Sequence, residues 1–352
     1  MIYLASFFFF MVYGQKFQTW LMLREIENAV IRLKVFKDEF RQIAIKTLKE
    51  ASGDKIDPTP RIDQFLEYFI IMPQNLDPAG IVPKLDHLID VSDQRLKDEV
   101  KIILPTVDQL KSTTMEGVLG VAINLNEIYR VVNHFYLTGK KNMSLYVIMQ
   151  IQMQLPLILQ LAGAMSVFGK AFVEGHPVGD GAGSLVAARM MYGKEKRTIA
   201  KDIVSAETNI EGRRVLVLKT EGPGVTVGKP GDGIKNLLEE CEGKVAAVIM
   251  VDAKGKYEGE KSGGTVEGVG SAIGGTGVDA FVIEEITLKY KIPIYAVGIK
   301  ESIEEAMAPM TKSIFEGVDI AVAKVRRIIL EETHQGDTII VAGIGNTVGI
   351  GQ

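Results

Sequence analysis

The chain has 352 residues, of which 47% are hydrophobic and 24% are charged, and its formal net charge is −4. This length allows two domains, and the charge lacks the basic excess typical of nucleic-acid-binding proteins, so no nucleic-acid partner is expected. Cys241 is the single cysteine, which excludes an intramolecular disulfide and a cysteine-rich metal site and is typical of a reducing compartment.

Residues 1–23 predict a membrane anchor. Residues 2–13 are uncharged and rich in Phe, although this run of about 12 residues is shorter than the roughly 20 that a spanning helix needs. Lys16 and Trp20 follow, and these residue types settle at the membrane–water interface. A buried core helix is the alternative structure for the same segment.

The charges after this segment predict its orientation. By the positive-inside rule, they place the rest of the chain in the cytoplasm. The expected location is therefore the cell membrane, single-pass or monotopic, with membrane lipid as a partner and the main body cytoplasmic. So short an anchor would bind the membrane more tightly when several copies act together, which favours a homo-oligomer. The basic residues are Lys16, Arg24, Arg32, Lys34 and Lys37.

Residues 24–174 predict a helical region. Apolar residues recur at helical spacing from Trp20 to Glu50, and longer helical patterns run from about 92 to 137 and from 144 to 173. Between them, Pro73, Pro78 and Pro83 with the polar turn at 75–77 leave room only for short elements.

Residues 175–352 predict an α/β domain. Strand-length apolar runs at 214–219, 245–251, 293–298 and 338–342 alternate with helix-like segments near 231–241, 279–290 and 301–330. Such alternation is typical of a mostly parallel sheet with crossover helices. The expected fold class is therefore α + α/β, with the helical region preceding the sheet.

The carboxyl ends of these strands predict a ligand site, because binding sites of open α/β sheets collect at that edge. Gly-bearing turns at 221–224, 298 and 343–346 and the carboxylate of Asp252 follow the four runs. The phosphate-binding motifs G-x-x-x-x-G-K-[ST] and G-x-G-x-x-G both fail at the Gly-rich stretches. No cofactor is expected.

Several short motifs resemble two related peptidase families. Residues 176–187 (HPVGDGAGSLVA) are similar to the D-G-x-G-P-x-V-A element of hydrogenase maturation endopeptidases and to the P-D-A-L-G-P element of the spore germination protease. Residues 251–253 (VDA) resemble their strand-end I-D-A motif, and residues 222–225 (GPGV) resemble the germination protease's A-P-G-V turn.

The order of these motifs implies a circular permutation. Residues 343–346 (GIGN) resemble the G-[IL]-G-N turn that lies on the first strand of both families, yet here they stand on the last strand. The resemblance therefore covers residues 175–352 only if the C-terminal tail returns beside Asp180, a rearrangement tolerated where termini meet. The whole chain resembles an archaeal membrane-anchored family of unknown function.

The resemblance implies a membrane-tethered peptidase or amidohydrolase that acts on a polypeptide substrate. Asp180 and Asp252 would be its catalytic pair, one ionised to activate water and one protonated to polarise the substrate carbonyl. The hydrogenase endopeptidases add a histidine that binds metal, but no histidine follows Asp252 at a comparable place, so no metal is expected. The substrate or oxyanion loop would comprise Gly222, Pro223, Gly224, Gly343, Gly345 and Asn346.

Other interpretations of the same residues remain open. Asp180 could cap the helix beginning near Ala182, since Asp is a favoured N-cap, and Asp252 could only end a strand. The protein would then be a non-catalytic, oligomeric scaffold on a hydrolase-like fold, binding a peptide or small anion on its Gly-rich rim.

Overall fold

A computed structural model describes residues 2–73 and 80–352, with backbone alone for residues 2–13 and 15. Its chain forms two compact units. Residues 1–68 and 118–169 form one, called the helical unit below. Residues 69–117 and 170–352 form the other, called the α/β unit. The turn expected at 75–77 lies outside the described residues, as do the side chains of the expected anchor at 2–13.

The helical unit is built on α1 (Ile2–Ala51), α2 (Thr59–Phe65) and most of α4 (Gln109–Asn142) and α5 (Leu145–Glu174). Ile26, Leu33 and Phe40 of α1 are buried at heptad spacing, so one stripe of this long helix faces its neighbours. Gly169 admits the ring of Phe40, because a Cβ there would lie 2.0 Å from a ring carbon.

The helical pattern at 92–137 contains a break that the sequence analysis did not predict. α3 (Ile81–Ile103) ends before Pro105, and α4 starts at Gln109. A proline disfavours the helical conformation in the residue before it, so the helix stops there. Pro83, expected to limit its surroundings to short elements, instead lies in the first turn of α3, where backbone N–H groups have no partner within the helix.

The α/β unit contains a seven-stranded sheet in the order β1-β2-β3-β7-β4-β6-β5. The central strands β3, β7, β4 and β6 are parallel, and β1, β2 and β5 are added antiparallel at the edges. This confirms the expected mostly parallel sheet. The bounds are β1 Lys196–Ala200, β2 Ile203–Ile210, β3 Arg213–Thr220, β4 Ala247–Gly255, β5 Thr265–Val269, β6 Ile294–Glu301 and β7 Thr338–Gly343.

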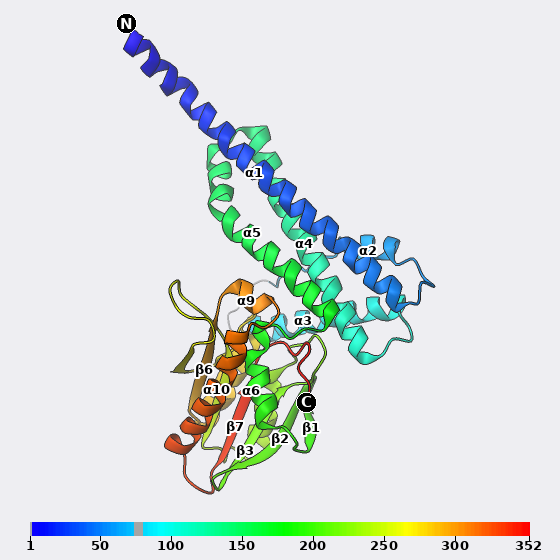
Figure 1. The fold of residues 1–352 in the computed structure, drawn as a ribbon, viewed down its shortest axis with the longest axis vertical. Helices are drawn as coiled ribbons and strands as arrows, with labels where there is room; N and C mark the ends of the chain where they lie inside the picture. The colour runs from blue at the N-terminus through cyan, green and yellow to red at the C-terminus, as the bar shows by residue number, and fades with distance from the viewer. Residues whose placement is uncertain (1, 74–79) are drawn as a thin grey trace. The chain divides into compact units, whose positions relative to one another are not determined.

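Helices cover both faces of the sheet (Figure 1). The short 3₁₀ turn η1 (Gly179–Gly181), α6 (Ala182–Met190) and α10 (Lys312–Glu332) belong to one face, and α7 (Pro230–Glu240) and α8 (Val278–Tyr290) to the other. Alternate strand residues pack into the two cores: Val217 and Val251 join α6 and α10, whereas Leu218 and Met250 join α7 and α8. The pattern expected at 301–330 divides into α9 (Ile303–Met307) and α10.

The connections that leave β4 and β6 open a crevice at the carboxyl ends of these adjacent strands. β4 continues through β5 to α8 on one face, whereas β6 continues to α10 on the other. A ligand site is expected where neighbouring strands diverge in this way. α3 belongs to the same unit, where Lys229 bonds Asp86 at 2.9 Å and Asp90 at 2.7 Å.

Candidate functional site

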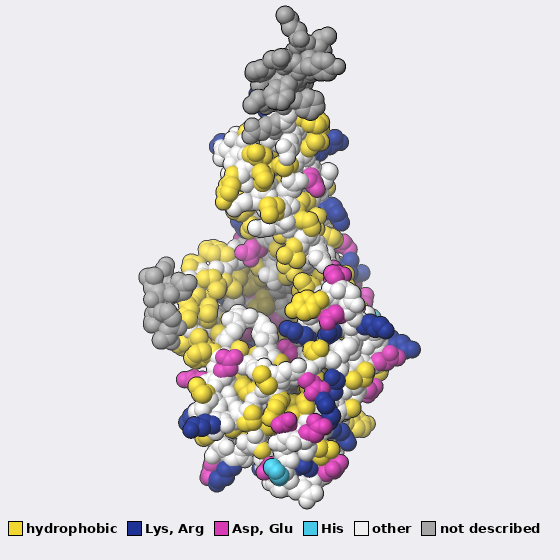
Figure 2. All heavy atoms as spheres, turned by 90° about the vertical axis from the view of Figure 1, so that its left-hand side faces the viewer, with side chains coloured by type: hydrophobic (Ala, Val, Ile, Leu, Met, Phe, Trp, Pro, Cys, Tyr) yellow, Lys and Arg dark blue, Asp and Glu magenta, His cyan; other side chains and the backbone are white. Residues whose placement is uncertain are grey.

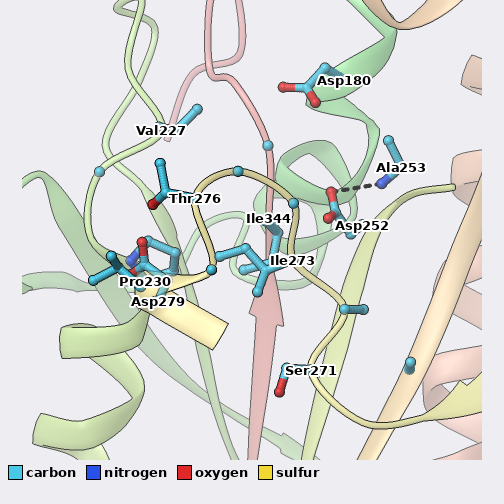
Figure 3. A pocket seen from close by; sticks show the side chains of 18 of the residues that line it. Asp180, Val227, Pro230, Asp252, Ala253, Ser271, Ile273, Thr276, Asp279 and Ile344 are labelled. Carbon is cyan, nitrogen blue, oxygen red and sulfur yellow. Dashed lines mark hydrogen bonds between the residues drawn. The ribbon is translucent and has the colours of Figure 1, made fainter. Parts of the chain in front are cut away.

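A cavity of about 930 Å³ lies at this crevice. Its wall includes Asp180 beside α6, residues 252–255 of β4, the Gly-rich segment 266–279, and Gly345 of the C-terminal tail. Asp180 and Asp252, which stand on separate elements far apart in sequence, face the same end of this cavity (Figure 3).

Asp180 is held by the tail. Its Oδ2 accepts a hydrogen bond of 2.9 Å from the backbone N–H of Asn346. Burial raises the pKa of the Asp180 carboxyl, and this hydrogen bond opposes that rise by favouring the ionised form. The N-cap of α6 is Gly181, with no side-chain cap bond. The alternative interpretation of Asp180 as a helix cap is therefore wrong.

Glycines allow the tail to approach Asp180 closely. Gly345 has φ +116°, and a Cβ there would lie 1.8 Å from the backbone oxygen of Asp180. A Cβ on Gly343 would lie 2.3 Å from the carbonyl oxygen of Gly183. Ser184 donates its hydroxyl to the carbonyl of Gly345 at 2.8 Å. The end of the chain and the start of α6 therefore interlock, which is the juxtaposition that the permuted resemblance implies.

Asp252 is the second carboxyl at the site. Its Oδ1 accepts the N–H of Ala253 at 2.8 Å. Burial, and then the charge of Asp180, raise the pKa of Asp252 to about 8, against hydrogen bonds from the amides of Ala253 and Gly274. Two carboxyls in such an arrangement compete for ionisation, so the pair tends to share a proton.

Glu301 is a third buried carboxyl close enough to feel the charges of the pair, although it does not line the cavity, and the sequence did not predict it. It ends β6, is 2% exposed, and neither of its oxygens has a hydrogen-bond partner among the described residues. Burial, followed by the charges of Asp180 and Asp252, raises the pKa of Glu301 to about 8. A Cβ on Gly179 would lie 2.5 Å from the Oε2 of Glu301 and 2.3 Å from the backbone oxygen of Glu305, so only glycine fits at position 179.

The turn at 222–224 braces the tail and is not among the residues that line the cavity. Gly349 donates its N–H to the carbonyl of Pro223 at 3.1 Å, and the Thr347 hydroxyl donates to the carbonyl of Gly224 at 3.0 Å. The side-chain amide of Gln352 donates to the carbonyl of Gly222 at 3.2 Å. The following residues, Thr226–Pro230, line the cavity instead.

The tail contributes residues 344 and 345 to the cavity wall, while Gly343 and Asn346 are not among the lining residues. Ile344 donates its N–H to the carbonyl of Val251 at 2.8 Å, and the Asn346 N–H is taken by Asp180. These two amides of the expected oxyanion loop therefore have structural partners.

The two histidines nearest the site along the chain are engaged at the surface. His176 pairs with Glu174 at 3.0 Å, and the side chain of His334 is 95% exposed. Within the described ranges, no group of three or more His, Cys, Asp or Glu side chains is arranged to hold a metal ion.

The protein is thus an open α/β sheet with two interacting carboxyls in a cavity at the carboxyl ends of its strands. The chain belongs to the family described as protein of unknown function (DUF1512): residues 1–175 match its N-terminal domain and residues 178–351 match its C-terminal domain. No curated protein and no solved structure matches the chain. The similarity to the peptidase families therefore remains a prediction from the motifs.

Proposed function

We propose that the α/β unit hydrolyses peptide or amide bonds with Asp180 and Asp252 as its water-activating pair. The observation that carries this proposal is the coupling of two carboxyls in one cavity, where the charge of Asp180 raises the pKa of Asp252. A pair that shares one proton offers a base and an acid to the same substrate at the same pH.

The hydrogen bonds assign a role to each carboxyl. Asp180, which accepts the Asn346 N–H, is the ionised member and takes a proton from water as the oxygen attacks the substrate carbonyl carbon. Asp252, with its pKa near 8, gives its proton to the carbonyl oxygen. Asp180 then passes its proton to the departing amine while Asp252 recovers one from the tetrahedral intermediate. Both carboxyls return to their starting states.

A non-catalytic binding role is the second candidate, and the Gly-rich wall of the cavity favours it. Positions 268, 270, 274, 275 and 277 are glycines with open space where a Cβ would stand. A wall of exposed backbone can bind an extended peptide or a small anion through N–H groups without any reaction. In that role the protein would be an oligomeric scaffold.

We propose further that the N-terminus tethers the protein to a membrane, as a single-pass or monotopic anchor with the main body cytoplasmic. α1 is helical from Ile2 onward, so the apolar run at 2–13 continues the helix that enters the helical unit. Among the described residues, α5, in the middle of the chain, is the one helix long and apolar enough to cross a membrane. However, Gln152 of α5 bonds Glu25 of α1, and a spanning α5 would draw that carboxylate into lipid.

The test compares wild-type protein with Asp180→Asn and Asp252→Asn on unfolded, fluorescently labelled polypeptides. Asp232→Asn is the matched control, because Asp232 is also partly buried but lies in the first turn of α7, outside the cavity wall. We expect each site variant to lose about 10²–10⁴-fold in turnover, the usual contribution of a general acid or base, and the control to keep its rate.

Two outcomes would reject catalysis. Equal turnover in all four proteins would assign the cleavage to a contaminant. Peptide binding by the wild type without cleavage, weakened when the cavity wall is altered by Gly275→Trp, would support the scaffold role.

A further inference from the structure

The tip of the α4–α5 hairpin lies beside residues 18–21 of α1. Gln152 of α5 bonds Glu25 at 2.5 Å, and Tyr136 of α4 bonds Glu27 at 2.7 Å. α5 runs parallel to α1, so counting back from residue 152 to its start at 145 reaches residue 18 of α1. α4 runs antiparallel, so counting from residue 136 to its end at 142 reaches residue 21. Both counts place the tip at residues 18–21.

α1 continues past this level. Thr19 is 4% exposed, whereas Lys16, Phe17 and Gln18 are exposed, so Thr19 is the first buried residue among the described side chains of α1. The helix from residue 2 to residue 18 is about 25 Å long at the usual rise of 1.5 Å per residue. That length approaches the roughly 30 Å of a bilayer's hydrocarbon core.

Apolar and aromatic side chains are exposed around the hairpin tip and the part of α1 beside it. We call these residues the collar: Phe17, Trp20, Leu21, Met143 and Tyr146. They are between 46% and 70% exposed. Phe17 stacks on Trp20 with ring centroids 6.1 Å apart, and the guanidinium of Arg24 lies 5.6 Å from the Trp20 ring. Figure 2 shows hydrophobic and basic side chains together on the surface of the helical unit. The basic residues near the collar are Lys16, Arg24, Lys140 and Lys141.

We propose that the hairpin tip is a second membrane contact that holds the helical unit upright on an anionic lipid surface. Met143 and Tyr146 enter the headgroup layer, while Lys140 and Lys141 lie near lipid phosphates. This inference rests on the proposed N-terminal tether. A short apolar anchor binds reversibly and needs a second signal for stable attachment. Aromatic rings and basic side chains are the residue types that supply one.

Trp20 is the only tryptophan, so the full-length chain carries a natural depth probe. The experiment measures quenching of tryptophan fluorescence by vesicles of brominated phosphatidylcholine and phosphatidylglycerol. Tyr146→Trp in a Trp20→Phe background reports on the tip. Val35→Trp in the same background is the control, because Val35 is 57% exposed but about 22 Å further along α1.

We expect quenching at positions 20 and 146 and none at position 35. Quenching at position 20 without quenching at 146 would leave the tether intact and overturn the hairpin contact. Quenching at all three positions would show that the unit lies flat and would also overturn it. Quenching at none would reject the tether itself.

A charge reversal tests the lipid preference. Lys141→Glu should weaken binding to vesicles containing phosphatidylglycerol about 10–30-fold, because each basic residue near an anionic surface contributes about five-fold. Binding to neutral phosphatidylcholine vesicles should not change. Equal loss on both vesicle types would contradict a role for lipid charge.

Discussion

The α/β unit and the helical unit illustrate two different departures from the usual burial pattern. The α/β unit encloses carboxyls, with Glu301 2% exposed and without a hydrogen-bond partner among the described residues. The helical unit exposes apolar side chains, with Met153 81% and Tyr146 70% exposed. Both arrangements cost free energy in water. The proposed catalytic pair and the proposed membrane contact would each give one of these arrangements a role.

The difference teaches where sequence constraints are tight. Around the carboxyls, glycines allow backbone segments to touch, so even one added Cβ atom would clash with a neighbouring segment. On the helical unit, exposed side chains such as Met153 have few protein neighbours, so the identity of each one matters less. Substitutions should therefore have large effects in the first region and small effects in the second.

The largest expected effect is at Gly345. Gly345→Val places a side chain against the backbone of Asp180 and forces a residue with φ +116° out of its conformation. We expect the free energy of unfolding to fall by more than about 3 kcal/mol, as for other severe steric conflicts, in urea titrations. Gly351→Ala, which meets open space, is the control. An unchanged midpoint for Gly345→Val would show that the tail does not pack on Asp180.

A smaller effect concerns pH. A carboxyl with a folded-state pKa near 8 binds its proton more tightly than in the unfolded chain, where the pKa is near 4.5. Unfolding then releases protons between these values, so stability falls as pH rises from about 5 to 9. Glu301→Gln cannot ionise and should make this fall less steep, as judged by melting temperature against pH.

The matched control for this experiment is Glu316→Gln on the surface of α10, where Glu316 pairs with Lys312 at 3.6 Å. It should melt like wild type at every pH. A Glu301→Gln profile that still parallels wild type would show that Glu301 is solvated in the folded protein.

The smallest effect belongs to the exposed face of α5. Met153→Gln should change the free energy of unfolding in solution by less than about 0.5 kcal/mol, because the side chain is already in water. Ile148→Val, at a position 1% exposed, should cost about 0.5–1.5 kcal/mol. If Met153→Gln were the more damaging change, this face would be packed in solution, and the contrast between the two units would fail.

The centre of the sheet was predictable because strands buried on both faces are continuously apolar. Residues 245–251 (VAAVIMV) show this, and β4 occupies them from Ala247. Three strands, β1, β2 and β5, were missed. All residues of β1 and β5 are at least partly exposed and carry no such run. The sequence of β2 (IVSAETNI) is interrupted by polar residues, although its first half is buried. The end of α3 was not predicted, because apolar residues recur at helical spacing on both sides of Pro105.

The site was predictable in its pair of aspartates but not in its third acid. Asp180 and Asp252 followed from motifs, and the structure brings them to one cavity. Glu301 was missed because β6 was expected to end at Gly298, whereas it continues three residues further to Glu301. A carboxylate directly after an apolar run of the form PIYAVGIK was the available signal. Residues 69–117, expected within the helical region, cluster with the α/β unit, where Lys229 pairs with Asp86.

The position of β7 has a consequence for biosynthesis. This strand is the last of the sheet to be translated, yet it lies between β3 and β4. A nascent chain must keep those two strands apart until the ribosome has delivered residue 343, and Asp180 gains its amide partner only three residues later.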